Sequence, residues 1–220
     1  MKIGMGYQGF TNNISQKLIH SGKYFYGGYY YQFGEKFRNK IQFQVANSNR
    51  EMKFDFPYIS AATSLAIYYD LNYRIKTTKK SAHYLGCYFG DFFTLNFFPR
   101  IDHENFLWEN QFLLGLSSMN NIRINHSKRI DINFRLPLFT TIHFNKMDRF
   151  DGDVPYDLPS NWVNGSFMKL LNAQYEIGYV FGTQGFTFGI YYQEEHNMTE
   201  NTLYGGFQAA AHSISFRIIY

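Results

Sequence analysis

The last ten residues of the chain, 211–220, alternate between apolar and polar side chains. One face of this segment carries Ile214, Phe216, Ile218 and Tyr220, and the other carries Ser213, Ser215 and Arg217. Successive side chains of a β-strand point to opposite faces, so a period of two residues indicates a strand. The segment therefore predicts a strand that separates an apolar environment from a polar one.

The same alternation runs through three earlier segments, residues 59–75, 129–145 and 166–181. Pro137 interrupts the second of them, and because proline cannot donate to a strand ladder we expect a bulge or local irregularity there. The complete set of strand-like segments is 2–11, 23–34, 39–48, 59–75, 82–97, 105–117, 129–145, 166–181, 185–195 and 202–220.

The composition favours a β protein in which only alternate residues are apolar. Of the 220 residues, 20% are aromatic, and the mean hydropathy is −0.35. No apolar run approaches the roughly 18 residues that a transmembrane helix needs. A membrane barrel has no such run, because only every second residue faces lipid. We expect one domain over residues 1–220, with the single Cys87 as a packing residue.

The connections between the segments alternate in length. Residues 34–39, 77–81 and 182–185 are short, with 118–128 as a looser member of that set; residues 12–21, 47–56, 99–104, 146–165 and 195–202 are long. Basic residues gather at the short connections and acidic residues in the long ones. Outer-membrane barrels pair short periplasmic turns with longer external loops.

With its alternating segments and its terminal aromatic residue, the chain resembles small bacterial outer-membrane β-barrel proteins, and its bias toward Asn, Lys, Tyr and Phe is similar to that of such proteins from the Bacteroidota. The resemblance implies an all-β, transmembrane, antiparallel up-and-down barrel of about ten strands with both termini periplasmic. It implies a mature chain in the outer membrane, its signal peptide removed. Expected partners are outer-membrane lipid, lipopolysaccharide and other outer-membrane proteins.

The polar faces of the segments predict a charged network inside the barrel. Its members are Asp70, Arg74, Glu109, Asp131, Arg135, His143 and Glu176. We expect Glu109 and Glu176 near Arg135, and Asp70 near Arg74, because an unpaired buried charge is costly. Two interpretations remain open, a rigid plug and a polar path for small solutes. Tyr24, Tyr26, Tyr29, Tyr30 and Tyr31 are expected to form a girdle at the membrane interface.

The longest predicted loop carries three aromatic residues that suit protein contact, Phe150, Tyr156 and Trp162. Its acidic stretch 148–157 either wraps a Ca²⁺ ion or is an ordinary solvated loop; it lacks the spacing of an EF-hand. No metal site and no cofactor is therefore predicted. Nucleic-acid binding is not expected, because the cations are dispersed among turns rather than gathered on one face.

Two enzymatic alternatives remain open. A lipid hydrolase would use His212 with Ser213 or Ser215, but the His-x-Ser-Asn type of signature is absent and strand alternation puts His212 and Ser215 on opposite faces. An omptin-like protease would draw on Asp102, His103, Asp148 and His196, whose spacing matches no known motif. We expect a protein without enzymatic activity.

The sequence thus predicts an integral barrel that acts as an accessory or structural subunit of a larger outer-membrane complex, or that presents its loops to a partner. The alternative is a narrow channel for small polar solutes, and the second alternative is a lipid hydrolase or omptin-like protease. A soluble up-and-down barrel, with its apolar residues inside, also stays open.

Overall fold

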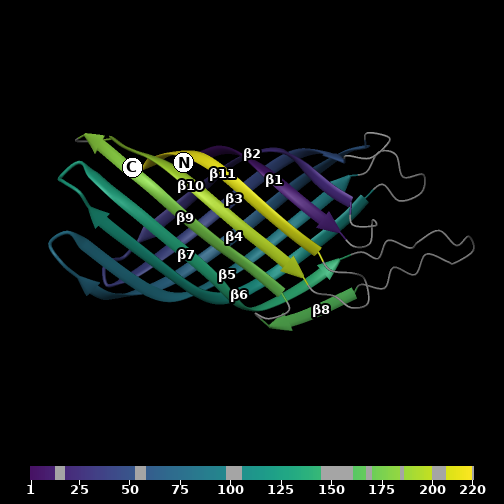
Figure 1. Ribbon diagram of the computed structural model, residues 1–220. Helices are drawn as coiled ribbons and strands as arrows, with labels where there is room; N and C mark the ends of the chain where they lie inside the picture. The colour runs from purple at the N-terminus through teal and green to yellow at the C-terminus, as the bar shows by residue number, and fades with distance from the viewer. Residues whose placement is uncertain are drawn as a thin grey trace, which may run out of the picture.

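The computed structural model describes residues 1–12, 18–52, 58–97, 106–144, 161–166, 170–183, 186–199 and 207–219 (Figure 1). These residues form long antiparallel strands. The strands are β1 (Lys2–Asn12), β2 (Leu18–Phe33), β3 (Phe37–Met52), β4 (Tyr58–Thr77), β5 (Ser81–Phe97), β6 (Phe106–Arg123), β7 (Lys128–Phe144), β8 (Asn161–Ser166), β9 (Leu170–Thr183), β10 (Phe186–Thr199) and β11 (Phe207–Ile219). Among the described residues, none belongs to a helix able to cross a membrane.

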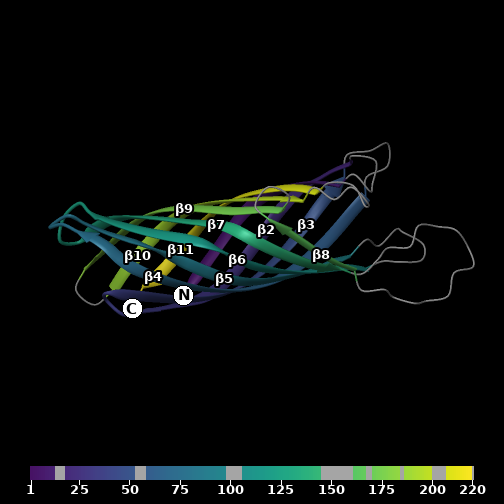
Figure 2. The same cartoon turned by 90° about the horizontal axis from the view of Figure 1, so that it is seen from below.

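The strands close into a ring. Strands β1 to β7 pair in chain order, β7 pairs with β9, and β11 pairs with β1, with Met5 opposite both Phe25 and Ile214. Every one of these neighbours is antiparallel, and the strands run obliquely around the barrel (Figures 1 and 2). The expected up-and-down barrel of ten strands is confirmed.

Strand β8 is the addition that the sequence pattern did not predict. It pairs with Phe139–Phe144 of β7, beyond Lys128–Arg135, where β7 pairs with β9. The expected loop over residues 146–165 is therefore wrong at its end, because residues 161–165 belong to a strand. The expected looser connection 118–128 is also wrong: β6 continues to Arg123, and only residues 124–127 separate it from β7.

Tight turns and both ends of the chain lie at one end of the barrel, here called the turn end. The turn end comprises residues 34–36, 78–80 and 124–127 together with Met1 and Ile219 (Figure 1). Gly34 has a φ of 84°, a left-handed conformation that glycine adopts without strain. The opposite end, from which the longer connections leave, is called the loop end.

The outer wall of the barrel is apolar. Large side chains such as those of Ile3, Met5, Phe25, Phe89 and Phe216 point outward and are exposed. A soluble monomer rarely exposes a continuous apolar surface of this kind, whereas a barrel in lipid requires one. Closed barrels also leave no unpaired strand edge, which a bilayer does not tolerate. The protein is a transmembrane β-barrel of the outer-membrane type.

The inner wall is polar, as the period of two predicts. Lys2, Lys40, Asp70, Asn72 and Arg217 are each 5% exposed or less. A small apolar cluster, comprising Ala66, Tyr68, Tyr88, Leu113 and the partly buried Phe92, interrupts this lining. The charged residues thus share a narrow interior and must find partners there.

The irregularity expected at Pro137 is confirmed. Gly115 lies opposite Pro137 and Leu114 opposite Phe139, so Leu138 is an extra residue in β7. One extra residue exchanges the inner and outer faces of everything that follows it. Thr140 is therefore buried inside. The expected inward position of His143 is wrong: His143 lies opposite Asn110 on the outer wall and packs edge-on against the Trp108 ring, with centroids 4.8 Å apart.

Candidate functional site

A charged network crosses the lumen at mid-height. Arg135 of β7 donates from Nε to Asp70 Oδ1 of β4 over 2.8 Å and from Nη2 to Asp70 Oδ2 over 2.6 Å. Strands β4 and β7 are not neighbours, so this bidentate pair spans the interior. The same guanidinium donates to Gln174 Oε1 at 3.0 Å and to Gln42 Oε1 at 3.4 Å. Arg135 therefore ties four strands together.

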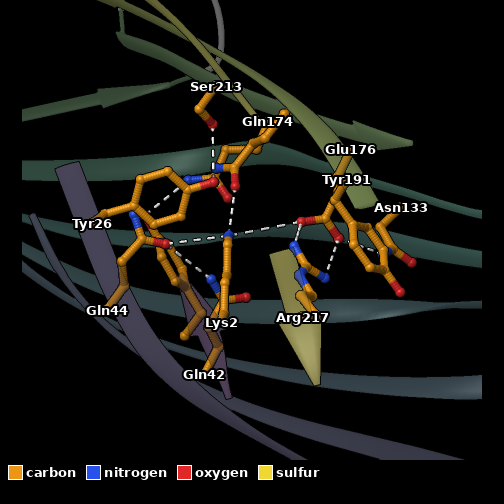
Figure 3. Close-up of polar contacts among 12 residues, drawn as sticks. Lys2, Tyr26, Gln42, Gln44, Asn133, Gln174, Glu176, Tyr191, Ser213 and Arg217 are labelled. Atoms are coloured by element: carbon orange, nitrogen blue, oxygen red, sulfur yellow. Dashed lines mark hydrogen bonds and ion pairs between the residues drawn. The ribbon is translucent and has the colours of Figure 1, made fainter. Parts of the chain in front are cut away.

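A second carboxylate, Glu176 of β9, gathers donors from three other strands (Figure 3). Arg217 of β11 donates through both terminal nitrogens to the two Glu176 oxygens, with Nη1 to Oε1 at 3.0 Å. Asn133 Nδ2 donates to Oε1 over 2.7 Å, and the Lys2 ammonium lies 3.9 Å from Oε2. Lys2 in turn donates to Gln193 Oε1 over 2.7 Å. The negative charge of Glu176 is thus fully partnered.

The third carboxylate, Asp131 of β7, lies nearer the turn end. It accepts hydrogen bonds from Asn121 Nδ2 at 2.7 Å, Arg129 Nε at 2.9 Å and the Tyr191 hydroxyl at 2.8 Å. Buried ions cost free energy unless their remaining hydrogen-bonding sites are filled, and this donor set meets that condition. Satisfied networks of this kind make an interior rigid.

Tyrosine rings hold the network against the wall. Tyr26 lies opposite Gly4, Tyr68 opposite Gly90, and Tyr191 opposite Gly178 in the register of their strands. A Cβ on Gly90 would stand 2.8 Å from Tyr68 Cδ1, so the ring lies flat over the glycine. Aromatic cover of glycines is a known device of sheet construction.

The inner faces of two of these rings carry the guanidinium groups of the network. The Arg135 guanidinium lies 4.5 Å from the Tyr68 centroid, and that of Arg217 lies 3.6 Å from the Tyr191 centroid. Wall, ring and cation therefore form successive layers, and each ring stabilises the charge it faces by a cation–π interaction. The expected interfacial girdle is correspondingly wrong for Tyr24, Tyr26 and Tyr30, which point inward, whereas Tyr29 and Tyr31 are outward and exposed.

Little space remains around the network. A cavity of about 20 Å³ lies among Lys40, Asp70, Arg135, Gln174 and Glu176, which is room for roughly one water molecule. Toward the turn end the lumen widens into a cavity of about 710 Å³, here called the vestibule. Tyr191 and Arg217 line its inner end, so the network forms its floor.

Only some of the predicted interior residues belong to the observed network. Asp70, Asp131, Arg135 and Glu176 lie in the network. Glu109 accepts a hydrogen bond from Gln111 in β6, and among the described residues Arg135 forms its ion pair with Asp70. The expected pairing of Glu176 with Arg135 is wrong, because Arg217 takes Glu176 and Asp70 takes Arg135.

The expected pair of Asp70 with Arg74 is also wrong. The two residues lie four positions apart along β4, and Asp70 pairs with Arg135 across the lumen instead. His143 is excluded from the interior by the bulge at Leu138.

Most of the predicted loop residues fall outside the part of the chain that the structure describes. Phe150, Tyr156 and the acidic stretch 148–157 lie outside the described residues. The backbone of Trp162 belongs to β8, opposite His143. Across the described ranges, no group of three or more His, Cys, Asp or Glu residues is arranged to hold a metal ion.

Sequence reasoning missed two central members of the network, Lys2 and Arg217. A signal was present for Arg217, because it lies on the polar face of the closing strand. The pattern does not reveal that the partner of Arg217 is Glu176. Strand β10 lies between β9 and β11, so the register of β10 with each of them decides which of their residues come close.

The residues that a lipid hydrolase would use lie on opposite sides of the barrel wall. Ser213 and Ser215 are buried inside, at 3% and 1% exposed. His212 points outward and its Nδ1 hydrogen-bonds the Tyr192 hydroxyl at 2.8 Å. His196, considered for proteolysis, also lies on the outer wall and contacts Glu194 at 2.6 Å. A serine nucleophile needs its base within hydrogen-bond reach, and these pairs do not provide it.

Comparison with solved structures finds other outer-membrane barrels. The translocator domain of the autotransporter NalP from Neisseria meningitidis has a TM-score of 0.46 at 8% identity, covering 98% of this chain and 87% of that one. The transport unit of the autotransporter AIDA-I from Escherichia coli has a TM-score of 0.47 at 10% identity, covering 100% and 89%. No protein-family model matches the chain, and no curated protein sequence matches it.

Proposed function

We propose that the protein is a non-enzymatic barrel that serves as an accessory or structural subunit of a larger outer-membrane complex. The observation that carries this proposal is the network across the lumen, in which the described residues enclose a cavity of about 20 Å³. Small barrels are commonly filled by their own side chains, whereas open channels are usual at higher strand numbers. A filled barrel offers its wall and its loops to partners rather than a passage to solutes.

In this proposal the turn end faces the periplasm and the loop end faces outward, surrounded by lipid and lipopolysaccharide. The short turns of residues 34–36, 78–80 and 124–127 support this orientation, because periplasmic turns of such barrels are short. The loops at the other end, with Phe150 and Tyr156, are then available to another outer-membrane protein.

The test is gentle detergent extraction of the tagged protein from its native membrane, followed by native electrophoresis and mass spectrometry. A stoichiometric complex is the expected result. Deletion of residues 148–158, which spares β8, should weaken that complex, while a Gly-Ser replacement of equal length separates the effect of loop chemistry from that of loop length. A variant barrel that stays folded and keeps every association would contradict the loop part of the proposal, and a barrel that always runs alone would contradict the whole.

The vestibule favours a second candidate, a narrow channel for small polar solutes. Its cavity of about 710 Å³ reaches the network from the turn end, so rearrangement of a few side chains would open a path. Under this alternative, Arg135→Ala and Glu176→Ala would change a conductance that the natural protein already shows. Glu194→Ala is the matched control, because Glu194 is also a strand carboxylate but lies on the outer wall beside His196.

A further inference from the structure

We infer that the vestibule is a binding site for a small molecule that carries phosphate groups. This inference is independent of the accessory role proposed above. It starts from the charges that line the cavity, which are almost all positive. Arg38, Lys40, Arg129 and Arg217 line it from the strands, Arg123 from the end of β6, and Lys79 and Lys80 from the turn between β4 and β5.

Only one carboxylate, Asp131, belongs to the described lining of the vestibule, and it is already taken. It accepts hydrogen bonds from Arg129, Asn121 and Tyr191. Arg217 is likewise committed to Glu176. Within the described part of the chain, Arg38, Arg123, Lys79 and Lys80 therefore have no ion pair with a carboxylate of the cavity.

Two of these cations lie deep and have unused binding capacity. Lys40 is 5% exposed and lies beside Asp70 and Glu176, but among the described residues its ammonium has neither a hydrogen bond nor an ion pair within 4.0 Å. Arg38 donates to Asn121 Oδ1, while its Nε is buried and has no partner among the described residues. Like charges gathered between low-dielectric walls raise the local potential and concentrate anions.

Aromatic rings position both groups without neutralising them. The Arg38 guanidinium lies 4.0 Å from the centroid of Tyr84, and the Lys40 ammonium lies 5.8 Å from that of Tyr30. Cation–π contact fixes a cation in place but leaves its charge and its donors available. The site is thus organised before any ligand arrives, which lowers the cost of binding.

The chemistry of the lining favours phosphate. A phosphate monoester carries about −1.5 to −2 charges at neutral pH and three strong acceptor oxygens, so one compact group can engage several cations. Guanidinium forks match such oxygens in bidentate geometry. The cavity volume of about 710 Å³ is within the range of small-molecule sites. The phosphate can belong to a soluble compound or to a lipid headgroup.

The experiment is calorimetric titration of the purified full chain in a neutral detergent with inorganic pyrophosphate. A second arm uses mixed micelles that contain phosphatidic acid. Saturable, salt-sensitive binding of pyrophosphate assigns the site to a soluble ligand, and binding of phosphatidic acid alone assigns it to a headgroup. Both results support the inference.

Arg38→Gln and Arg123→Gln are the test variants, and each should weaken binding about tenfold because a charge-assisted hydrogen bond is lost. Lys36→Met is the matched control: Lys36 is a cation in the turn between β2 and β3 that does not line the vestibule. It should leave affinity within about twofold. Unheated electrophoresis checks that each variant is folded. The inference is overturned if folded protein binds neither probe at millimolar concentration, or if Lys36→Met weakens binding as much as the test variants.

Discussion

Replacement of Arg135 by methionine should strongly destabilise the barrel. Methionine keeps much of the length of the side chain but removes both hydrogen bonds to Asp70, at 2.8 and 2.6 Å. Asp70 is 1% exposed, and the neighbouring cavity of about 20 Å³ has room for only about one water molecule, so the carboxylate is not fully rehydrated. Breaking a buried pair on one side costs about 3 to 5 kcal/mol.

A double-mutant cycle isolates this interaction. Arg135→Met, Asp70→Asn and the double variant are refolded into phospholipid vesicles, and the free energy of unfolding in urea is followed by tryptophan fluorescence. The double variant should lose clearly less than the sum of the single losses, because it leaves no charge unpaired. The reasoning is refuted if the two single losses in the free energy of unfolding are additive and each is below about 1 kcal/mol, because an exposed ion pair contributes about that much.

Two further perturbations test the wall of the barrel. Gly90→Ala places a Cβ 2.8 Å from Tyr68 Cδ1 and should lower the free energy of unfolding by about 1 to 3 kcal/mol, because the ring must move. Gly27→Ala is its control: the nearest atom to the added Cβ is 3.9 Å away, and near-neutral stability is expected in the same urea titration. Cys87, which was expected to be a packing residue, is instead exposed on the outer wall, so a spin label there should collide with oxygen more readily than with a water-soluble nickel chelate. The opposite preference would contradict a lipid-facing β5.

The period of two residues predicts most of the fold, because burial in a barrel is decided by strand face. In segments 59–75 and 166–181, the described side chains of residues 61–75 and 173–181 lie inside and outside as expected. Pro137 also predicts the bulge, because a proline in the sequence means that one backbone N–H of the strand is missing. The length of the bulge is not visible, however, and a single extra residue is what moves His143 to the outer wall.

The pairing inside the lumen is the part that the sequence does not reveal. Alternation says that Arg135 points inward but not which carboxylate it meets across the barrel, because that depends on the stagger of strands β4 and β7. The positions of the tyrosines are equally hard to predict. The sequence alone predicts Tyr26 at the membrane interface, and only the strand register shows that it lies opposite Gly4. Contacts between strands, rather than the pattern within one strand, therefore decide whether a tyrosine lies in the interfacial girdle or fills the lumen.

The most direct test of a closed lumen is the conductance of the natural protein in a planar bilayer. The network of Asp70, Arg135, Glu176 and Arg217 predicts no unitary steps, with a leak no greater than that of protein-free membrane. Arg135→Ala should introduce brief openings, because it removes the side chain that ties four strands together. Stable unitary conductance from the natural barrel would contradict the account and favour the channel.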